Sequence, residues 1–361
     1  MSVQAFENRK SNNVSLTWIL PLLLLAANLP ALGPDGSGSL EIGTDIAPWH
    51  QTIITVWPFG TVSFERNSSL SEHATVTLPI VSGLSVAASG SDQDRSGNQV
   101  FNTVNGWDAI GYSDSITSFG FQLRLFPGAW THAEFMSDAS ANPDGWCWWP
   151  SINIGYSRTH DFASYNPPAN ALLVLAMDMD PHPSNWTVVD QDLDLGSALP
   201  LASFLTLEMG YHLNLDETVD GFADAFFEPN DAAIPNEYWQ THLGLRAYWD
   251  LWAPGGSDRK GALVPGYGRQ GQLVILGTWD YRGSSRSGYV QQWRGLELRT
   301  PLTSSLGLGI GAQNIEANAF LAPTGANAML SDVIDVSWAY TVKLAWAFGS
   351  PAHRAGASSL F

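Results

Sequence analysis

Large apolar residues alternate with small or polar residues along much of the chain. The clearest run lies near the C-terminal end, where every second residue is large and apolar: Val336, Trp338, Tyr340, Val342, Leu344, Trp346 and Phe348. Successive side chains of a β-strand point to opposite faces, so this period of two predicts a strand with one apolar face.

The same alternation recurs in several other segments. It is strong over 205–215 and 239–251, and weaker copies run through 119–125, 152–156, 173–179, 273–281 and 306–310. After residue 38 the chain contains no run of 18 apolar residues, which excludes further membrane helices. The sequence therefore predicts an all-β protein.

Segment length and tryptophan spacing favour a membrane barrel over a soluble sandwich. The alternating runs extend over about 11 to 15 residues, whereas soluble strands average ~5–6 residues and bilayer-crossing strands ~9–11. Trp338 and Trp346 share one face, and a tilted strand separates them by roughly 20 Å along the barrel axis. Trp239 and Trp249 are separated by roughly 25 Å in the same way, which is typical of two aromatic girdles bordering an apolar band.

A repeated turn predicts the topology. The pattern Pro, Ile or Leu, any residue, Ser, any residue, Leu begins at Pro79, Pro200 and Pro301, and we interpret 57–60 and 126–129 as two further turns of this class. We expect these five turns at the periplasmic end. The polar connections 92–116, 137–148, 216–236 and 318–332 are then expected at the other end, with a strand-like piece at 104–112 folding inward as a constriction.

Counting strands between these turns predicts one antiparallel, up-and-down transmembrane β-barrel of about 14–16 strands over residues 38–348. The count is open before residue 66 and around 252–269. A tail, 349–361, follows the last strand.

The N-terminus has the form of a secretory signal peptide, which we assign to residues 1–33. Arg9 and Lys10 precede an apolar stretch from Val14 to Leu32, and the small residues Ala31 and Gly33 follow. A retained anchor helix is the alternative, although Pro21 interrupts the stretch.

Over residues 38–348 the chain resembles the outer-membrane β-barrels of Gram-negative bacteria. Its last strand resembles the terminal strand by which the barrel-assembly machinery recognises its clients, but departs from that pattern because the tail follows it. Either Phe348 or Phe361 is then the terminal aromatic residue, and the stronger alternation favours Phe348. The resemblance implies location in the outer membrane and contact with its lipid and lipopolysaccharide.

Composition narrows the possible partners. The formal charge of −18 argues against nucleic acid as a partner, because phosphates require a basic surface. Only 14% of the residues are charged, and the chain contains 16 tryptophans. This composition is typical of a protein whose outer surface is not exposed to water alone. Cys147 is the single cysteine, so the chain forms no internal disulfide.

The polar face of the strands supplies the candidate functional residues. We predict that the pore is lined by Glu208, His212, His242, Arg246, Asp250, Glu297, Arg299 and Lys343. Acids outnumber bases on this face as a whole, so the lumen is expected to favour cations.

Five aspartates form the sharpest cluster in the sequence: Asp178, Asp180, Asp190, Asp192 and Asp194. If they stand on two paired strands across the loop 181–186, their carboxylates come close together and predict a Ca²⁺ site. The alternative is a solvated acidic rim whose charges are screened by salt.

Three functions remain open from the sequence. The first is a channel for small solutes, which we favour because a barrel of this size has room for an aqueous pore. The second is a structural or adhesion protein with an acidic rim. The third is a barrel hydrolase using His212 or His242, which is disfavoured because the chain has no Gly-x-Ser-x-Gly or His-Glu-x-x-His motif. We therefore expect no enzymatic activity and no cofactor other than calcium.

Overall fold

The computed structural model describes residues 38–56, 60–81, 83–103, 106–127, 150–166, 184–202, 204–221, 238–251, 263–264, 266–284, 289–321 and 331–348. The regular structure in these residues is entirely β-strand. Within them, no helix has the length and apolar character that crossing a membrane requires. The expected signal peptide at 1–33 and the tail at 349–361 lie outside the described residues.

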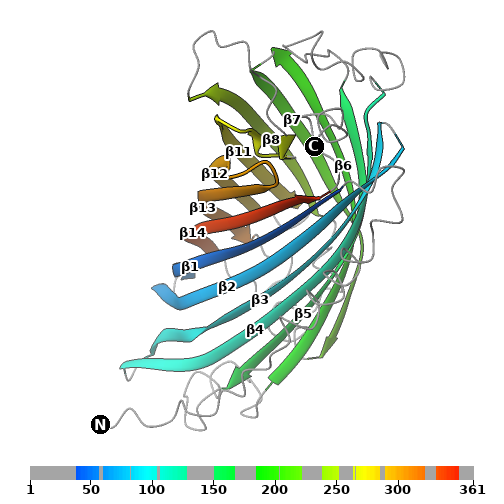
Figure 1. The fold of residues 1–361 in the computed structure, drawn as a ribbon. Coiled ribbons are helices and arrows are strands. Elements are labelled where there is room, and N and C mark those ends of the chain that lie inside the picture. Colours follow the sequence, from blue (N-terminus) through cyan, green and yellow to red (C-terminus); the bar gives the residue numbers. More distant parts are fainter. Residues whose placement is uncertain are drawn as a thin grey trace, which may run out of the picture.

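Twelve strands form one closed antiparallel barrel (Figure 1). They are β1 (Gly38–Val56), β2 (Gly60–Val81), β3 (Leu84–Thr103), β4 (Gly106–Leu125), β5 (Ser151–Asn166), β6 (Ser184–Ala202), β7 (Leu205–Gly221), β8 (Tyr238–Asp250), β11 (Gln272–Ser284), β12 (Tyr289–Pro301), β13 (Leu306–Leu321) and β14 (Ser331–Phe348). Each strand pairs with its neighbour in the chain, and β14 pairs with β1 to close the ring. The predicted all-β, up-and-down barrel is confirmed.

The predicted count of 14–16 strands is wrong. β4 pairs directly with β5, and β5 pairs directly with β6. The expected strand at 173–179 therefore has no place in the wall between them, and it lies outside the described residues. Alternation alone does not decide whether a segment enters a sheet, because membership also requires a neighbouring strand with free backbone donors and acceptors.

The segment 92–116 corrects a second expectation. It was predicted as a long loop with an inward constriction at 104–112. In the structure β3 continues to Thr103 and β4 begins at Gly106, and Asn102 pairs with Trp107 near the tip of this hairpin. Because backbone hydrogen bonds hold a strand together whatever its side chains, this polar segment extends the wall.

The three proline-initiated turns lie at one end of the barrel, which we call the turn end. They join β2 to β3, β6 to β7 and β12 to β13, as predicted. Gly83 adopts a φ of 76° in the first of them, a conformation that glycine reaches without steric cost. Phe348 of β14 pairs with Gly38 at this end, so the barrel begins and finishes here.

For two connections the predicted end of the barrel is wrong. The 57–60 turn joins β1 to β2 at the opposite end, which we call the loop end, because β1 starts at the turn end. The segment 137–148 belongs to the β4–β5 connection, which leaves and rejoins the wall at the turn end, and it lies outside the described residues. The β7–β8 and β13–β14 connections lie at the loop end, as expected for 216–236 and 318–332.

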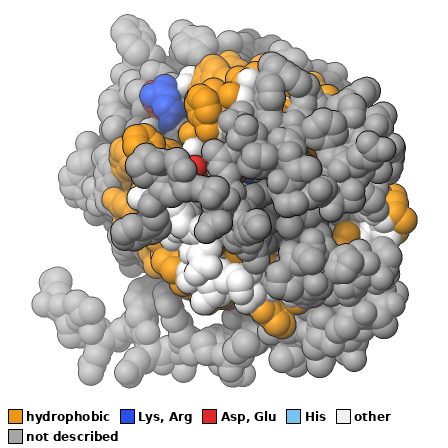
Figure 2. Space-filling model, turned by 45° about the horizontal axis from the view of Figure 1, so that its top comes forward, with side chains coloured by type: hydrophobic (Ala, Val, Ile, Leu, Met, Phe, Trp, Pro, Cys, Tyr) orange, Lys and Arg blue, Asp and Glu red, His pale blue; other side chains and the backbone are white. Residues whose placement is uncertain are grey.

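The outer face of the barrel is apolar. On β14, Trp338 and Trp346 are 47% and 48% exposed, whereas Ala345 and Ala347 on the other face are 1% exposed. β7 and β8 follow the same rule, since Met209, Tyr211, Leu243 and Leu245 are exposed. Hydrophobic side chains appear at several places around the periphery in Figure 2.

Soluble monomers rarely expose an apolar surface of this extent, whereas the lipid-facing side of a transmembrane barrel is apolar. The protein is therefore a transmembrane β-barrel of the kind found in bacterial outer membranes.

A short hairpin occupies part of the lumen. It consists of β9 (Leu263–Val264) and β10 (Gly268–Arg269) and belongs to the β8–β11 connection at the turn end. Tyr267 at its tip is fully buried and clusters with Val264 and with the inward-facing Ala345 and Ala347. We call residues 263–269 the lumen hairpin; it packs against the wall and narrows the barrel at this end.

Candidate lumen binding site

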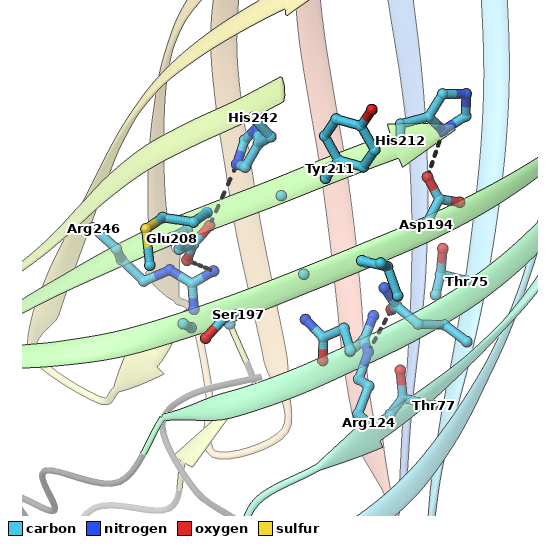
Figure 3. Close-up of a pocket in the computed structure, with 18 of the residues that line it drawn as sticks. Thr75, Thr77, Arg124, Asp194, Ser197, Glu208, Tyr211, His212, His242 and Arg246 are labelled. Atoms are coloured by element: carbon cyan, nitrogen blue, oxygen red, sulfur yellow. Dashed lines mark hydrogen bonds and ion pairs between the residues drawn. The ribbon is translucent and has the colours of Figure 1, made fainter. Parts of the chain in front are cut away.

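A cavity of about 470 Å³ lies inside the barrel next to the lumen hairpin, which contributes Gly266 to its wall. Its size falls within the ~300–1,000 Å³ typical of small-molecule sites. Its charged lining residues are Glu41, Arg124, Asp194, Glu208, His212, His242, Arg246 and Arg299. Neutral polar residues also line the cavity, and they include Ser39, Thr75, Thr77, Gln122, Asn153 and Gln240. Figure 3 shows the two histidines toward the top of the view and Arg124 and Arg246 lower.

One side of the cavity is built by β7 and β8. Glu208 of β7 forms an ion pair with Nη2 of Arg246 of β8. His242, also on β8, places Nε2 at 4.0 Å from Glu208 Oε2 and Nδ1 at 2.8 Å from Asp280 Oδ1. The strand register brings these groups together, because Glu208 pairs with Gly244, midway between His242 and Arg246.

A second group joins β6 to β7. His212 Nδ1 lies 2.5 Å from Asp194 Oδ1, and His212 Nε2 lies 3.4 Å from Asp192 Oδ1. Asn214 donates a hydrogen bond of 3.0 Å to Asp192. These two aspartates therefore contact protein donors from the neighbouring strand.

The strand pairing on which the calcium hypothesis depends is wrong. β6, which carries Asp190, Asp192 and Asp194, pairs with β5 and β7, while Asp178 and Asp180 lie outside the described residues. Across the described strands, no group of three or more His, Cys, Asp or Glu residues is arranged to hold a metal ion.

A third group lies beside the lumen hairpin. Glu297 accepts hydrogen bonds from Arg299 Nε at 2.7 Å and from Lys343 Nζ at 3.1 Å. Arg299 also stacks over the Tyr267 ring, with its guanidinium carbon 5.4 Å from the ring centre. The Tyr267 hydroxyl donates to Glu41 at 2.8 Å. Burial, together with the Glu41 charge, raises the pKa of Tyr267, so the hydroxyl remains a donor.

The predicted pore-lining residues thus fall into two sets. Glu208, His212, His242, Arg246 and Arg299 surround the cavity. Glu297 and Lys343 stand beside Arg299 outside the cavity wall, and Asp250 ends β8, where it accepts a hydrogen bond of 2.9 Å from Gln272.

Sequence reasoning missed Tyr267, because the lumen hairpin has no alternating pattern. A signal was present on the strands that it contacts. Their inward positions are occupied by Gly307, Gly309, Ala345 and Ala347, and a Cβ atom at Gly307 would lie 2.7 Å from the Tyr267 ring. A strip of small residues on an inward face indicates that another segment packs against it.

Comparisons with known proteins find only solved structures of similar overall fold. No family model matches the chain, and no curated protein matches its sequence. Solved structures similar to it include the transport unit of the autotransporter AIDA-I from Escherichia coli (TM-score 0.47, 12% identity, covering 91% of this chain and 97% of that one). The β domain of the Bordetella autotransporter BrkA is another (TM-score 0.46, 10% identity, 86% and 100%). The Pseudomonas putida toluene transporter TodX is a third (TM-score 0.38, 8% identity, 90% and 93%). Identities this low say nothing about activity, so the fold assignment depends on the strand pairing.

Proposed function

We propose that this protein is an outer-membrane channel for small polar solutes. The observation that carries the proposal is a polar, charge-lined cavity enclosed by a closed transmembrane barrel. A barrel that served only as an anchor would gain more stability from an apolar or tightly packed interior, since buried charges are costly unless they are paired. The neutral polar groups between the ion pairs offer hydrogen bonds to a passing solute.

We further propose that the channel prefers cations among bare inorganic ions. The lumen-facing acids on the described strands include Glu41, Asp45, Asp192, Asp194, Glu208, Asp280 and Glu297, whereas the arginines and lysine that face them include Arg124, Arg246, Arg299 and Lys343. Excess negative charge in a narrow lumen raises the local cation concentration.

The surroundings of the channel belong to the same proposal. Its exposed aromatic and aliphatic face suits lipid and lipopolysaccharide, with Trp338, Trp346 and Trp249 at the borders of the apolar band. We expect the alternating β14 to serve as the strand that the barrel-assembly machinery recognises. We propose no enzymatic activity, because the chain has no Gly-x-Ser-x-Gly or His-Glu-x-x-His motif.

Planar-bilayer recording of the purified full chain tests the proposal. We expect discrete conductance steps and, across a KCl gradient, a reversal potential that favours K⁺ over Cl⁻. Absence of conductance at high protein load would overturn the channel assignment. If chelators also lowered the thermal stability of the protein, the alternative function, a structural protein with a calcium-binding rim, would be favoured instead. A reversal potential favouring Cl⁻ would overturn the cation preference alone.

A further inference from the structure

The guanidinium of Arg246 is only partly satisfied by the protein. Its side chain is 9% exposed and pairs through Nη2 with Glu208. Its Nε and Nη1 atoms have no hydrogen-bond partner among the described residues. Buried donors in folded proteins are almost always paired, so two free donors of one buried arginine beside a cavity point to a missing acceptor.

Arg124 of β4 lines the same cavity and is also short of acceptors. Its Nε donates to Gln122 Oε1 at 2.7 Å, and Gln122 is neutral. Arg124 is close enough to Arg246 and Glu41 for their charges to interact. Glu41, however, already accepts the hydrogen bond of Tyr267, and in the described part of the chain no carboxylate forms an ion pair with Arg124.

Each carboxylate of the cavity wall already has a partner in the protein. Glu208 pairs with Arg246, Asp194 with His212, and Glu41 with Tyr267. The third arginine of the wall, Arg299, is held by Glu297, which lies outside the cavity. Among the described residues, Arg124 therefore has no acidic partner, and Arg246 has two donors left over beside its ion pair with Glu208, although the lumen as a whole is acidic.

We propose that the cavity binds the carboxylate of a small, hydroxyl-rich solute between Arg124 and Arg246. This inference rests on the proposed channel function and names the class of solute that the channel carries. A guanidinium offers parallel N–H donors that match the two oxygens of a carboxylate, and such bonds are the strongest of their kind. Thr75, Thr77, Gln122, Asn153 and Gln240 line the remainder of the cavity and suit hydroxyl groups.

The carboxylate site is compatible with the cation preference of bare ions. A chloride ion crossing the lumen meets an excess of negative charge, and it has no hydroxyl groups with which to contact the neutral wall. A sugar-acid-like solute makes both kinds of contact at one place. The arrangement thus discriminates between anions by shape and hydrogen bonding rather than by charge alone.

Calorimetric titration of the purified full chain in detergent tests this site without requiring conduction. We would titrate potassium gluconate, with sorbitol as the matched polyol lacking the carboxylate and KCl as the salt control. We expect saturable gluconate binding, and at least about tenfold weaker binding of sorbitol and chloride, the loss that follows from removing charge-assisted hydrogen bonds.

Arg124→Gln carries the mutational test, because it leaves no carboxylate unpaired. We expect it to weaken gluconate binding by roughly tenfold or more and to leave sorbitol unaffected. Arg246→Lys keeps the charge beside Glu208 but loses the planar fork, so it should also weaken gluconate binding. Arg294→Gln, an exposed arginine hydrogen-bonded to Gln292, is the matched control and should bind as the wild type does.

Equal affinity for gluconate and sorbitol, or an unchanged gluconate affinity in Arg124→Gln, would overturn the carboxylate site. Each variant is first checked for folding by its heat-modifiable mobility in gels. Failure of the wild type to conduct would count against the channel, whereas conduction without gluconate binding would count against this inference alone.

Discussion

At the scale of single residues, the lumen is organised by charges that are satisfied across strands. Glu297 on β12 bridges Arg299 on its own strand and Lys343 on β14, and the three side chains are between 12% and 17% exposed. Pairs this far from water depend on one another, because a charge left without its partner keeps its desolvation cost.

Replacing Glu297 with Gln should therefore destabilise the barrel strongly. Arg299 and Lys343 would both lose their carboxylate, and breaking a buried pair costs about 3 kcal/mol. Urea unfolding in lipid vesicles measures the change in the free energy of unfolding. The exposed Arg294→Gln is the control and should shift this free energy by less than about 0.5 kcal/mol. Equal stability of the two variants would show that the Glu297 cluster contributes nothing.

A second residue-scale prediction concerns the slot that holds Tyr267. Gly307→Val would place a Cβ atom 2.7 Å from the Tyr267 ring, so the ring must leave its slot. We expect a loss of about 1–3 kcal/mol from overpacking and new reactivity of Tyr267 toward nitration, read by mass spectrometry.

Gly277→Val is the matched control, because a Cβ atom there meets nothing within 4 Å. Tyr267 should stay protected from nitration in this variant. Protection of Tyr267 in Gly307→Val as well would mean that the hairpin does not dock as described.

At the scale of elements, the wall strands and the lumen hairpin are stabilised in different ways. The wall strands are stabilised by continuous backbone ladders, which explains why polar stretches such as the tips of β3 and β4 remain in register. The hairpin has only two residues in each strand and depends on Tyr267 for its position. An element that is held by a few side chains is the most readily displaced part of a fold.

Removing the lumen hairpin should enlarge the pore. Replacing residues 263–269 with a Gly-Ser linker of equal length removes Tyr267 and Val264 from the lumen, so we expect larger single-channel conductance in planar bilayers. Tyr267→Ala should show a smaller increase in the same direction. Tyr281→Ala, on the outer side of β11, should leave conductance unchanged. Identical conductance in all four proteins would show that the hairpin does not narrow the ion path.

At the scale of the whole molecule, one closed sheet has an apolar outer face toward lipid and a polar inner face toward the lumen. The apolar run on the outer face of β14 extends from Trp338 to Trp346 and has Val342 at its centre. The inward neighbours Ala339 and Ala345 are buried and small, which leaves room for the polar interior. Closure through the β1–β14 pairing removes the open sheet edges that lipid would not tolerate.

A charge on the outer face should cost more than the same charge on the inner face. We expect Val342→Arg to destabilise the barrel in vesicles by about 2–4 kcal/mol, because the arginine would face the bilayer midplane. Gln313→Arg is the matched lumen variant, since Gln313 pairs with the small residues Gly295 and Ala339, and it should cost less than about 1 kcal/mol. A larger loss for Gln313→Arg would reverse the assignment of the two faces.

The amino-acid sequence determined the fold class, the outward face of the long strands and the three proline-initiated turns. Each follows from a local rule, since a period of two assigns faces and proline is confined to strand ends and bulges. The inward positions of Glu208, His212, His242 and Arg246 follow from the same parity.

The tertiary structure alone decided the strand count, the entry of the lumen hairpin and the partners of the charged groups. Strand membership depends on which distant segment supplies the facing backbone, as the direct β5–β6 pairing shows. The meeting of Tyr267 with Glu41, more than two hundred residues away in the chain, depends on barrel closure. A local pattern holds no information on such contacts, because they are set only when the ring closes.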